Sequence, residues 1–284
     1  MARLFLLTFI TMTAFAANSL LNRAALIGTE TGPAAFAAIR LVSGAVCLAV
    51  LVGARNGLPK LMTRNRLLGA GSLALYVLGF SFAYVALDAG LGALILFGIV
   101  QLTMFFGAVS GGERPAPARW VGSIIALFGL AWLVWPGMTD APATVPVLLM
   151  IAAGLGWGVY SLVGRGATDP LGETSANFLC AAPIAIAAWL VFPDGMTSEG
   201  ALLAVLSGAV TSGLGYALWY SLLPRLDATV AALVQLTVPV IAVAGGVLLL
   251  SEQTTLRLIL ASTVILGGVA FGILGQRKIG SKGS

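Results

Sequence analysis

The dominant pattern along the chain is a series of long apolar runs separated by short polar corners. A helix that crosses a bilayer takes about 20 mainly apolar residues. Ten runs meet this length, at approximately 4–27, 33–53, 67–87, 90–110, 118–136, 145–164, 174–192, 201–223, 229–250 and 255–275. The runs are continuously apolar and lack the alternation that is typical of strands. They predict an all-α polytopic membrane protein whose short loops leave no room for a soluble domain.

Composition supports this interpretation. Charged residues make up 9% of the chain and hydrophobic residues 59%, whereas soluble domains carry about 25% charged residues. Most of the surface is therefore expected to face lipid. The 36 glycines lie mainly within the apolar runs, which predicts closely packed helices. Cys47 and Cys180 have neither disulfide nor metal-site spacing, so we expect no metal and no other cofactor.

Positive charges lie at the ends of the apolar runs, which argues against a nucleic-acid partner despite a sequence pI of 9.6. With the N-terminus in the cytoplasm, twelve of the fifteen Lys and Arg residues fall on the inside, and only Arg257 lies in an outer loop. Arg23 and Arg40 lie within spans or near their ends. This distribution predicts ten spans with both termini inside. The opening stretch "MARLFLLTFITMTAFAANS" is similar to a signal peptide, but we expect it to be retained as the first span.

An internal repeat appears when the chain is shifted by 139 residues. Leu87–Glu113 then aligns with Leu226–Glu252 without a gap, with seven identities that include both acidic pairs, Asp88 with Asp227 and Glu113 with Glu252. A second match pairs Phe15–Arg23 with Trp157–Arg165. We therefore expect two five-helix repeats, 1–140 and 141–284. Because five is odd, the second repeat must be inverted, and inverted repeats carry a substrate site near the midplane. Asp88 and Asp227 are expected to cap the helices that follow them.

Three motifs resemble those of a known family. "GGERP" and "LSEQT" each place a glutamate after the fourth span of one half, and "GLGWGVYSLVGR" opens the sixth span with aromatic residues. With ten spans and two repeats, the whole chain resembles EamA-type members of the drug/metabolite transporter superfamily, particularly the YddG-type exporters of aromatic amino acids. The resemblance implies two inverted halves around a central cavity, and export of small metabolites across a bacterial inner membrane. Pro239 in the ninth span departs from Val100 in the fourth, so the halves need not bend alike.

Several aromatic and amide side chains are candidates for the lining of that cavity. Residues four apart share a helix face, so the aromatic side chains of the third span form one stripe, and those of the sixth and eighth spans form others. Amides inside a span need polar partners. The candidates are Asn18, Tyr76, Phe80, Tyr84, Gln101, Trp157, Tyr160, Trp219, Gln235 and Thr237. Ordinary helix packing, an interfacial aromatic belt and interhelical hydrogen bonds are the alternatives for these positions.

Charged residues give less information about the transport cycle. Arg40 lies inside a span, where a charge usually marks function, although it could also extend to the interface or pair with Glu30. Arg23 and Arg165 are expected to be anchors. No histidine is present and the acids lie at span ends, which favours a facilitator over an obligate proton antiporter.

The same composition argues against an enzyme, because a chain without histidine has no Ser–His or zinc-protease motif. A channel, or transport of nucleosides, drug cations or nucleotide sugars, stays open as an alternative. The expected partners are the bilayer and a small-molecule substrate such as an amino acid. We expect a monomer, and a dimer through Gly268 and Gly272 is the alternative.

Overall fold

The computed structural model describes residues 2–54, 64–135, 141–164, 167–222, 225–226 and 234–280. Its regular elements over these residues are all helical. They are α1 (Ala2–Gly28), α2 (Pro33–Gly53), α3 (Arg64–Ala83), α4 (Ala89–Ser110), α5 (Pro117–Val134), α6 (Thr144–Gly164), α7 (Pro170–Val191), α8 (Ser198–Val205), the π-helix η1 (Leu206–Leu214), α9 (Gly215–Leu222), α11 (Thr237–Leu250) and α12 (Leu256–Gly280).

The apolar runs correspond closely to these helices. In the described part of the chain nine helical segments are long and apolar enough to cross a membrane, and α8, η1 and the start of α9 form one of them. The ninth expected run, 229–250, is represented by α11, which has 14 residues; residues 227–233 lie outside the described part. Proline begins α2, α5 and α7, where its fixed φ suits the first turn and its missing N–H costs no hydrogen bond. The chain is an all-α, multi-pass membrane protein.

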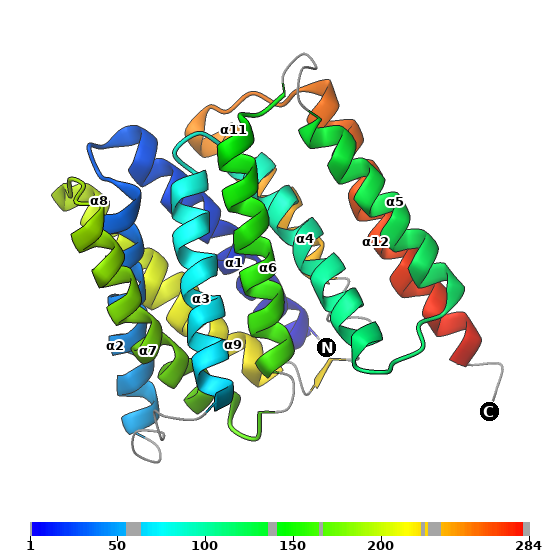
Figure 1. The fold of residues 1–284 in the computed structure, drawn as a ribbon, viewed down its shortest axis with the longest axis horizontal. Helices are drawn as coiled ribbons and strands as arrows, with labels where there is room; N and C mark the ends of the chain where they lie inside the picture. Colours follow the sequence, from blue (N-terminus) through cyan, green and yellow to red (C-terminus); the bar gives the residue numbers. More distant parts are fainter. Residues whose placement is uncertain are drawn as a thin grey trace.

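The helices form one bundle in which α5 and α12 lie side by side along one edge (Figure 1). α2 and α7 pack together toward the opposite edge, and α1, α3, α4 and α6 lie between these pairs. The start of α1, the link between α4 and α5, and the end of α12 all lie on one side of the bundle, as an even number of crossings requires. We call this the inner side, following the positive charges, and the opposite side the outer side.

Glycines set the closest helix crossings. A Cβ on Gly156 of α6 would lie 2.7 Å from the carbonyl oxygen of Ser72 and 2.8 Å from the backbone nitrogen of Tyr76, so only glycine permits this approach to α3. Gly208 of η1 packs on the Arg40 carbonyl of α2 in the same way. Close approach of this kind drives helix association in lipid, where apolar burial gives little advantage.

The glycines of α12 pack within the chain. A Cβ on Gly122 of α5 would overlap the Gly268 carbonyl and would lie 2.8 Å from the Cα of Gly272. The Gly268–Gly272 surface, which the sequence offered for self-association, is therefore occupied by α5 of the same molecule.

The π-helix η1 changes which side chains share a face. In an α-helix, residues five apart are separated by about 140° around the axis, because each residue turns by about 100°. The i→i+5 bonding of a π-helix widens the turn. Ser207, Thr211 and Ser212 consequently all reach one atom, the Oδ1 of Asn18 in α1. A regular α-helix would not direct all three hydroxyls to the same point.

We predict that Gly208→Ala lowers the free energy of unfolding by about 1–3 kcal/mol, because the added methyl group overpacks the crossing of η1 with α2. Gly71→Ala is the matched control: a Cβ at this position in α3 meets nothing within 4 Å. That change should be neutral or should stabilise the helix by about 0.5–1 kcal/mol. Thermal unfolding of the purified proteins in detergent measures both, and an unchanged midpoint for Gly208→Ala contradicts the prediction.

Candidate functional site

An aromatic cluster lies at the centre of the bundle, with Trp157 of α6 in its middle. The Trp157 ring centroid lies 5.0 Å from that of Tyr76 in α3, 5.1 Å from that of Tyr216 in α9 and 5.4 Å from that of Tyr160. Phe15 of α1 meets Tyr216 edge-on at 5.6 Å. Four helices thus supply rings to one cluster, and the glycine next to Trp157 lets α6 approach α3 closely enough for these contacts.

A small cavity lies inside this cluster. Its lining comes from α1, α3, α4, α6 and α9, and consists of Phe15, Asn18, Ser19, Tyr76, Phe80, Leu96, Phe97, Trp157 and Tyr216. The cavity volume is about 20 Å³, which is room for about one water molecule. Sites for small molecules are typically about 300–1,000 Å³. The structure is therefore closed around its centre, and the rings must separate before a metabolite can enter.

Asn18 gives the cavity a polar wall. Its Oδ1 accepts hydrogen bonds from Ser207 at 2.9 Å, from Thr211 at 2.6 Å and from Ser212 at 3.3 Å. All four side chains are buried. Asn18, the candidate from the first span, therefore joins the cavity to the hydroxyl groups of η1. Its side-chain oxygen accepts all three of its hydrogen bonds from residues of the protein.

Arg40 of α2 lies directly behind this wall and is 1% exposed. Its Nη2 donates to the Tyr76 hydroxyl at 3.0 Å, and both Nε and Nη2 are 3.4 Å from Ser212 Oγ. The guanidinium carbon lies 5.0 Å from the ring centroid of Phe80. Both structural alternatives for Arg40 are wrong. Its burial excludes extension to the interface, and no ion pair between described residues joins Arg40 to Glu30.

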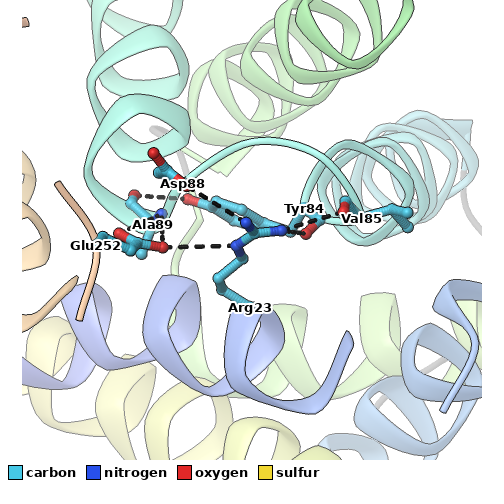
Figure 2. Close-up of polar contacts among 6 residues, drawn as sticks. All are labelled: Arg23, Tyr84, Val85, Asp88, Ala89 and Glu252. Atoms are coloured by element: carbon cyan, nitrogen blue, oxygen red, sulfur yellow. Dashed lines mark hydrogen bonds and ion pairs between the residues drawn. The ribbon is translucent and has the colours of Figure 1, made fainter. Parts of the chain in front are cut away.

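A charged network closes the outer end of the bundle (Figure 2). Arg23, five residues before the end of α1, lies 3.3 Å from Asp88 Oδ1 and 3.5 Å from Glu252 Oε1. It also donates to the carbonyl oxygens of Tyr84 and Val85, at 3.0 and 3.1 Å. We call Arg23, Asp88, Ala89 and Glu252 the outer network. Arg23 joins α1 to the α3–α4 turn and to the loop after α11, as expected of an anchoring residue.

The expectation that Asp88 caps α4 is wrong. Asp88 occupies the N-cap position, but its side chain makes no capping hydrogen bond. The Ala89 N–H instead donates to the Glu252 carboxylate, at 2.9 and 3.0 Å from its two oxygens. Asp88 turns toward the Arg23 guanidinium, where a charge-assisted hydrogen bond is stronger than a bond to a neutral amide. Asp227 lies outside the described residues.

Tyr84 connects the outer network to the cavity. Its ring is fully buried and lies 4.6 Å from that of Phe80, and its hydroxyl donates to the Ala89 carbonyl at 3.2 Å. Tyr84 is therefore not part of an aromatic belt at the membrane interface. The third-span stripe of Tyr76, Phe80 and Tyr84 therefore forms a continuous series of edge-on ring contacts from the cavity to the outer network.

The other candidates lie elsewhere. Gln101 lines a separate pocket with Phe105 and Arg119, between α4, α5 and α12. Thr237 is exposed and donates to the Val234 carbonyl at 2.6 Å, and Gln235 is half-buried two residues before α11 begins. Trp219 is buried and touches Phe15 edge-on at 6.0 Å, beside the cluster. The structure thus brings together Asn18, Tyr76, Phe80, Trp157 and Tyr160, with Tyr84 and Trp219 at the border.

The cavity-lining residues that the candidate set missed are mainly neighbours of its members. Phe15 and Ser19 lie three residues before and one residue after Asn18, and Tyr216 lies three before Trp219. Helical periodicity around the chosen residues could have found Phe15 and Tyr216. Leu96 and Phe97 belong to an apolar run without any polar signal, so the sequence offered no reason to select them.

The bundle of membrane-spanning helices thus encloses a buried aromatic cavity with a polar wall, as expected for a membrane protein that moves small molecules. The model of the EamA-like transporter family matches residues 144–274. An uncharacterized protein of Pseudomonas aeruginosa is 48% identical over 94% of this chain and 93% of its own length. The chain belongs to the EamA-like transporter family.

More distant relatives agree with this assignment. A probable amino-acid metabolite efflux pump of Escherichia coli is 26% identical over 76% of this chain and 81% of its own. An uncharacterized transporter of Bacillus subtilis, YoaV, is 24% identical over 84% and 86%. A solved crystal structure superposes with a TM-score of 0.66 at 23% identity, covering 94% of this chain and 98% of the other, which shows the shared fold.

Burial raises the pKa of the Glu252 carboxyl above its usual range, and the nearby Asp88 charge adds to this rise. The hydrogen bond from Ala89 and the Arg23 charge act in the opposite direction. Because the raised pKa belongs to the folded state, the protonated form is favoured by folding. The associated stability is present below the unfolded-state pKa, about 4.3 for a glutamate, and is lost as the pH rises through the folded-state pKa.

We therefore predict that Glu252→Gln matches the wild type in thermal stability below about pH 4 and exceeds it at neutral pH. Glutamine keeps an acceptor for the Ala89 N–H without the partly desolvated charge. Thermal unfolding across pH measures the difference between the variants, and Glu199→Gln, at an exposed carboxyl on the same side, is the control. A variant less stable than the wild type at neutral pH would mean that the Arg23 ion pair outweighs the burial of the charge.

Proposed function

We propose that this protein exports small metabolites, namely amino acids with aromatic or hydrophobic side chains, from the cytoplasm across a bacterial inner membrane by alternating access. The proposed substrates include tryptophan, phenylalanine, tyrosine, methionine and threonine. The observation that carries the proposal is the closed central cavity, in which the faces and edges of aromatic rings meet a polar wall on Asn18. Rings of this kind bind apolar and aromatic side chains favourably.

The closed cavity favours a carrier over a channel. An open pore needs a continuous polar path, whereas the centre of this bundle holds a space of about 20 Å³ beneath the buried Tyr84 and the outer network. A substrate can enter such a space only when helices move apart. Saturable flux with counterflow is therefore expected, and flux that rises linearly with concentration would favour the channel.

We infer that the moving parts are two inverted halves, 1–140 and 141–284. Exchange of the halves maps α1 on α6, α2 on α7, α3 on α8–η1–α9, α4 on α11, and α5 on α12. The neighbours of each helix support this exchange: α3 packs on α6 as α9 packs on α1, and α4 packs on α6 as α11 packs on α1. α2 packs on η1 as α7 packs on α3. A site between inverted halves is reached from either side as they rock.

The amino-acid assignment also draws support from the relatives, since an Escherichia coli protein of similar length is named a probable amino-acid metabolite efflux pump. We propose that transport follows the substrate gradient or is weakly coupled. Carboxylates of the described residues lie in loops, caps and first turns of helices and not deep within the spans. Counterflow in liposomes with a panel of amino acids, nucleosides, cationic drugs and nucleotide sugars tests the substrate class, and an absolute need for an imposed pH gradient would contradict facilitated transport.

We predict that Trp157→Ala lowers amino-acid counterflow at least tenfold, because it removes the ring that contacts Tyr76, Tyr160 and Tyr216. Each aromatic pair is worth about 0.5–1.5 kcal/mol beyond its buried area. Trp135→Ala is the matched control, since that ring is 60% exposed at the end of α5. Initial rates in proteoliposomes, normalised to folded protein, measure both. Equal rates for the two variants would contradict the assignment of the cavity as the substrate site.

A further inference from the structure

The centre of the bundle holds a cation without a counterion. Arg40 is 1% exposed, and the ion pairs of the described residues do not include it. A guanidinium remains charged at any physiological pH, so the protein cannot relieve this charge by losing a proton. A buried, uncompensated charge is costly in a bundle surrounded by lipid, and such residues are retained where they meet a substrate or an ion.

Arg40 lacks hydrogen-bond acceptors as well as a counterion. Of its five N–H donors, those on Nε and Nη2 are directed to Tyr76 and Ser212. Both bonds to Ser212 are long, at 3.4 Å. Nη1 is buried and has no hydrogen-bond partner. Two donors of a fully buried cation are thus left without an acceptor, although more than nine-tenths of buried polar groups in proteins have one.

Arg40 is separated from the cavity by one layer of side chains. Tyr76 and Phe80 line the cavity, and the guanidinium carbon lies 5.3 and 5.0 Å from their ring centroids. On the other side Ser212 receives Arg40 and donates to Asn18, which also lines the cavity. If α3 moved away from η1, these two partners would separate and the guanidinium would face the enlarged cavity.

We propose that Arg40 binds the carboxylate of the transported substrate and so selects for molecules that carry one. This inference rests on the proposed function and names the substrate group that the site recognises. A carboxylate supplies both the missing negative charge and the missing acceptors, because its two oxygens match the fork of the guanidinium. The aromatic rings beside Arg40 then receive the apolar part of the same molecule. A cationic drug is disfavoured, because it would place a second positive charge beside Arg40.

The experiment compares four indole ligands. Tryptophan, tryptophan amide and tryptamine share the ammonium and carry a carboxylate, an amide or neither, and indole-3-acetate carries a carboxylate without the ammonium. Binding to the purified full chain is measured by thermal stabilisation and by displacement in liposome counterflow. The wild type should prefer the two carboxylates over the amide and the amine by about tenfold or more, as expected for a charge-assisted hydrogen bond. Arg40→Gln should reduce this preference to about onefold, and Arg40→Lys should retain part of it.

Arg257→Gln is the matched control. Arg257 is also buried, and it donates to the carbonyl oxygens of Trp132 and Trp135, remote from the cavity. Its replacement removes a buried arginine but should leave the preference for carboxylates unchanged. A purely structural role for Arg40 would lower binding of all four ligands equally in Arg40→Gln, and this result overturns the proposal, as does a wild type without preference.

The outcomes separate this proposal from the proposed function. If indole-3-acetate binds in an Arg40-dependent manner and no amino acid is exchanged, the carboxylate site stands and amino-acid export fails. If tryptophan is exchanged and Arg40→Gln keeps the wild-type preference for tryptophan over tryptophan amide, amino-acid export stands and the carboxylate site fails. Absence of binding by both carboxylates overturns the assignment of Arg40.

Discussion

Close approach of backbones at glycine is the constraint on which the rest of this structure depends. In lipid, apolar side chains gain little by leaving the solvent, so helices associate through tight packing and polar contacts. Gly156 brings α6 onto α3 and thereby places Trp157 against Tyr76. Gly208 brings η1 onto α2, beside Arg40. Both crossings lie next to the cavity. Gly156 and Gly208 therefore determine where the aromatic rings and the buried Arg40 lie.

The buried polar groups form the second level of organisation. Asn18 collects three hydroxyls of η1, and Ser212 passes this network on to Arg40. From Arg40 the contacts continue through Tyr76 and Phe80 to Tyr84, whose carbonyl accepts from Arg23. One continuous set of contacts therefore extends from the cavity to the outer network. A helix movement that opens the cavity cannot leave the outer end of α3 unaffected.

Much of the fold could be predicted from the sequence, because membrane spans are encoded locally in length and hydropathy. The expected boundaries of α2 and α4 lie within one residue of the observed ones. The aromatic stripe of α3 was also predictable, since a spacing of four residues needs only helical geometry. The position of Gln101 in a separate pocket with Arg119 was not predictable. Asn18 and Gln101 lie in similar apolar runs, and only the helices that surround them decide which of the two lines the central cavity. The partners of Arg40 and the π-helix likewise depend on tertiary packing that no local pattern records.

The cap on α4 has a consequence for biosynthesis. Ala89 begins its helix with an N–H that is bound by Glu252, a residue 163 positions later in the chain. Until the intervening segment has been synthesised, Glu252 is not available to this N–H, and of the two carboxylates that later flank Arg23 only Asp88 is present. The outer ends of α1 and α4 therefore acquire their final partner only when the loop between α11 and α12 has been synthesised, so a late part of the chain completes the contacts of two early helices.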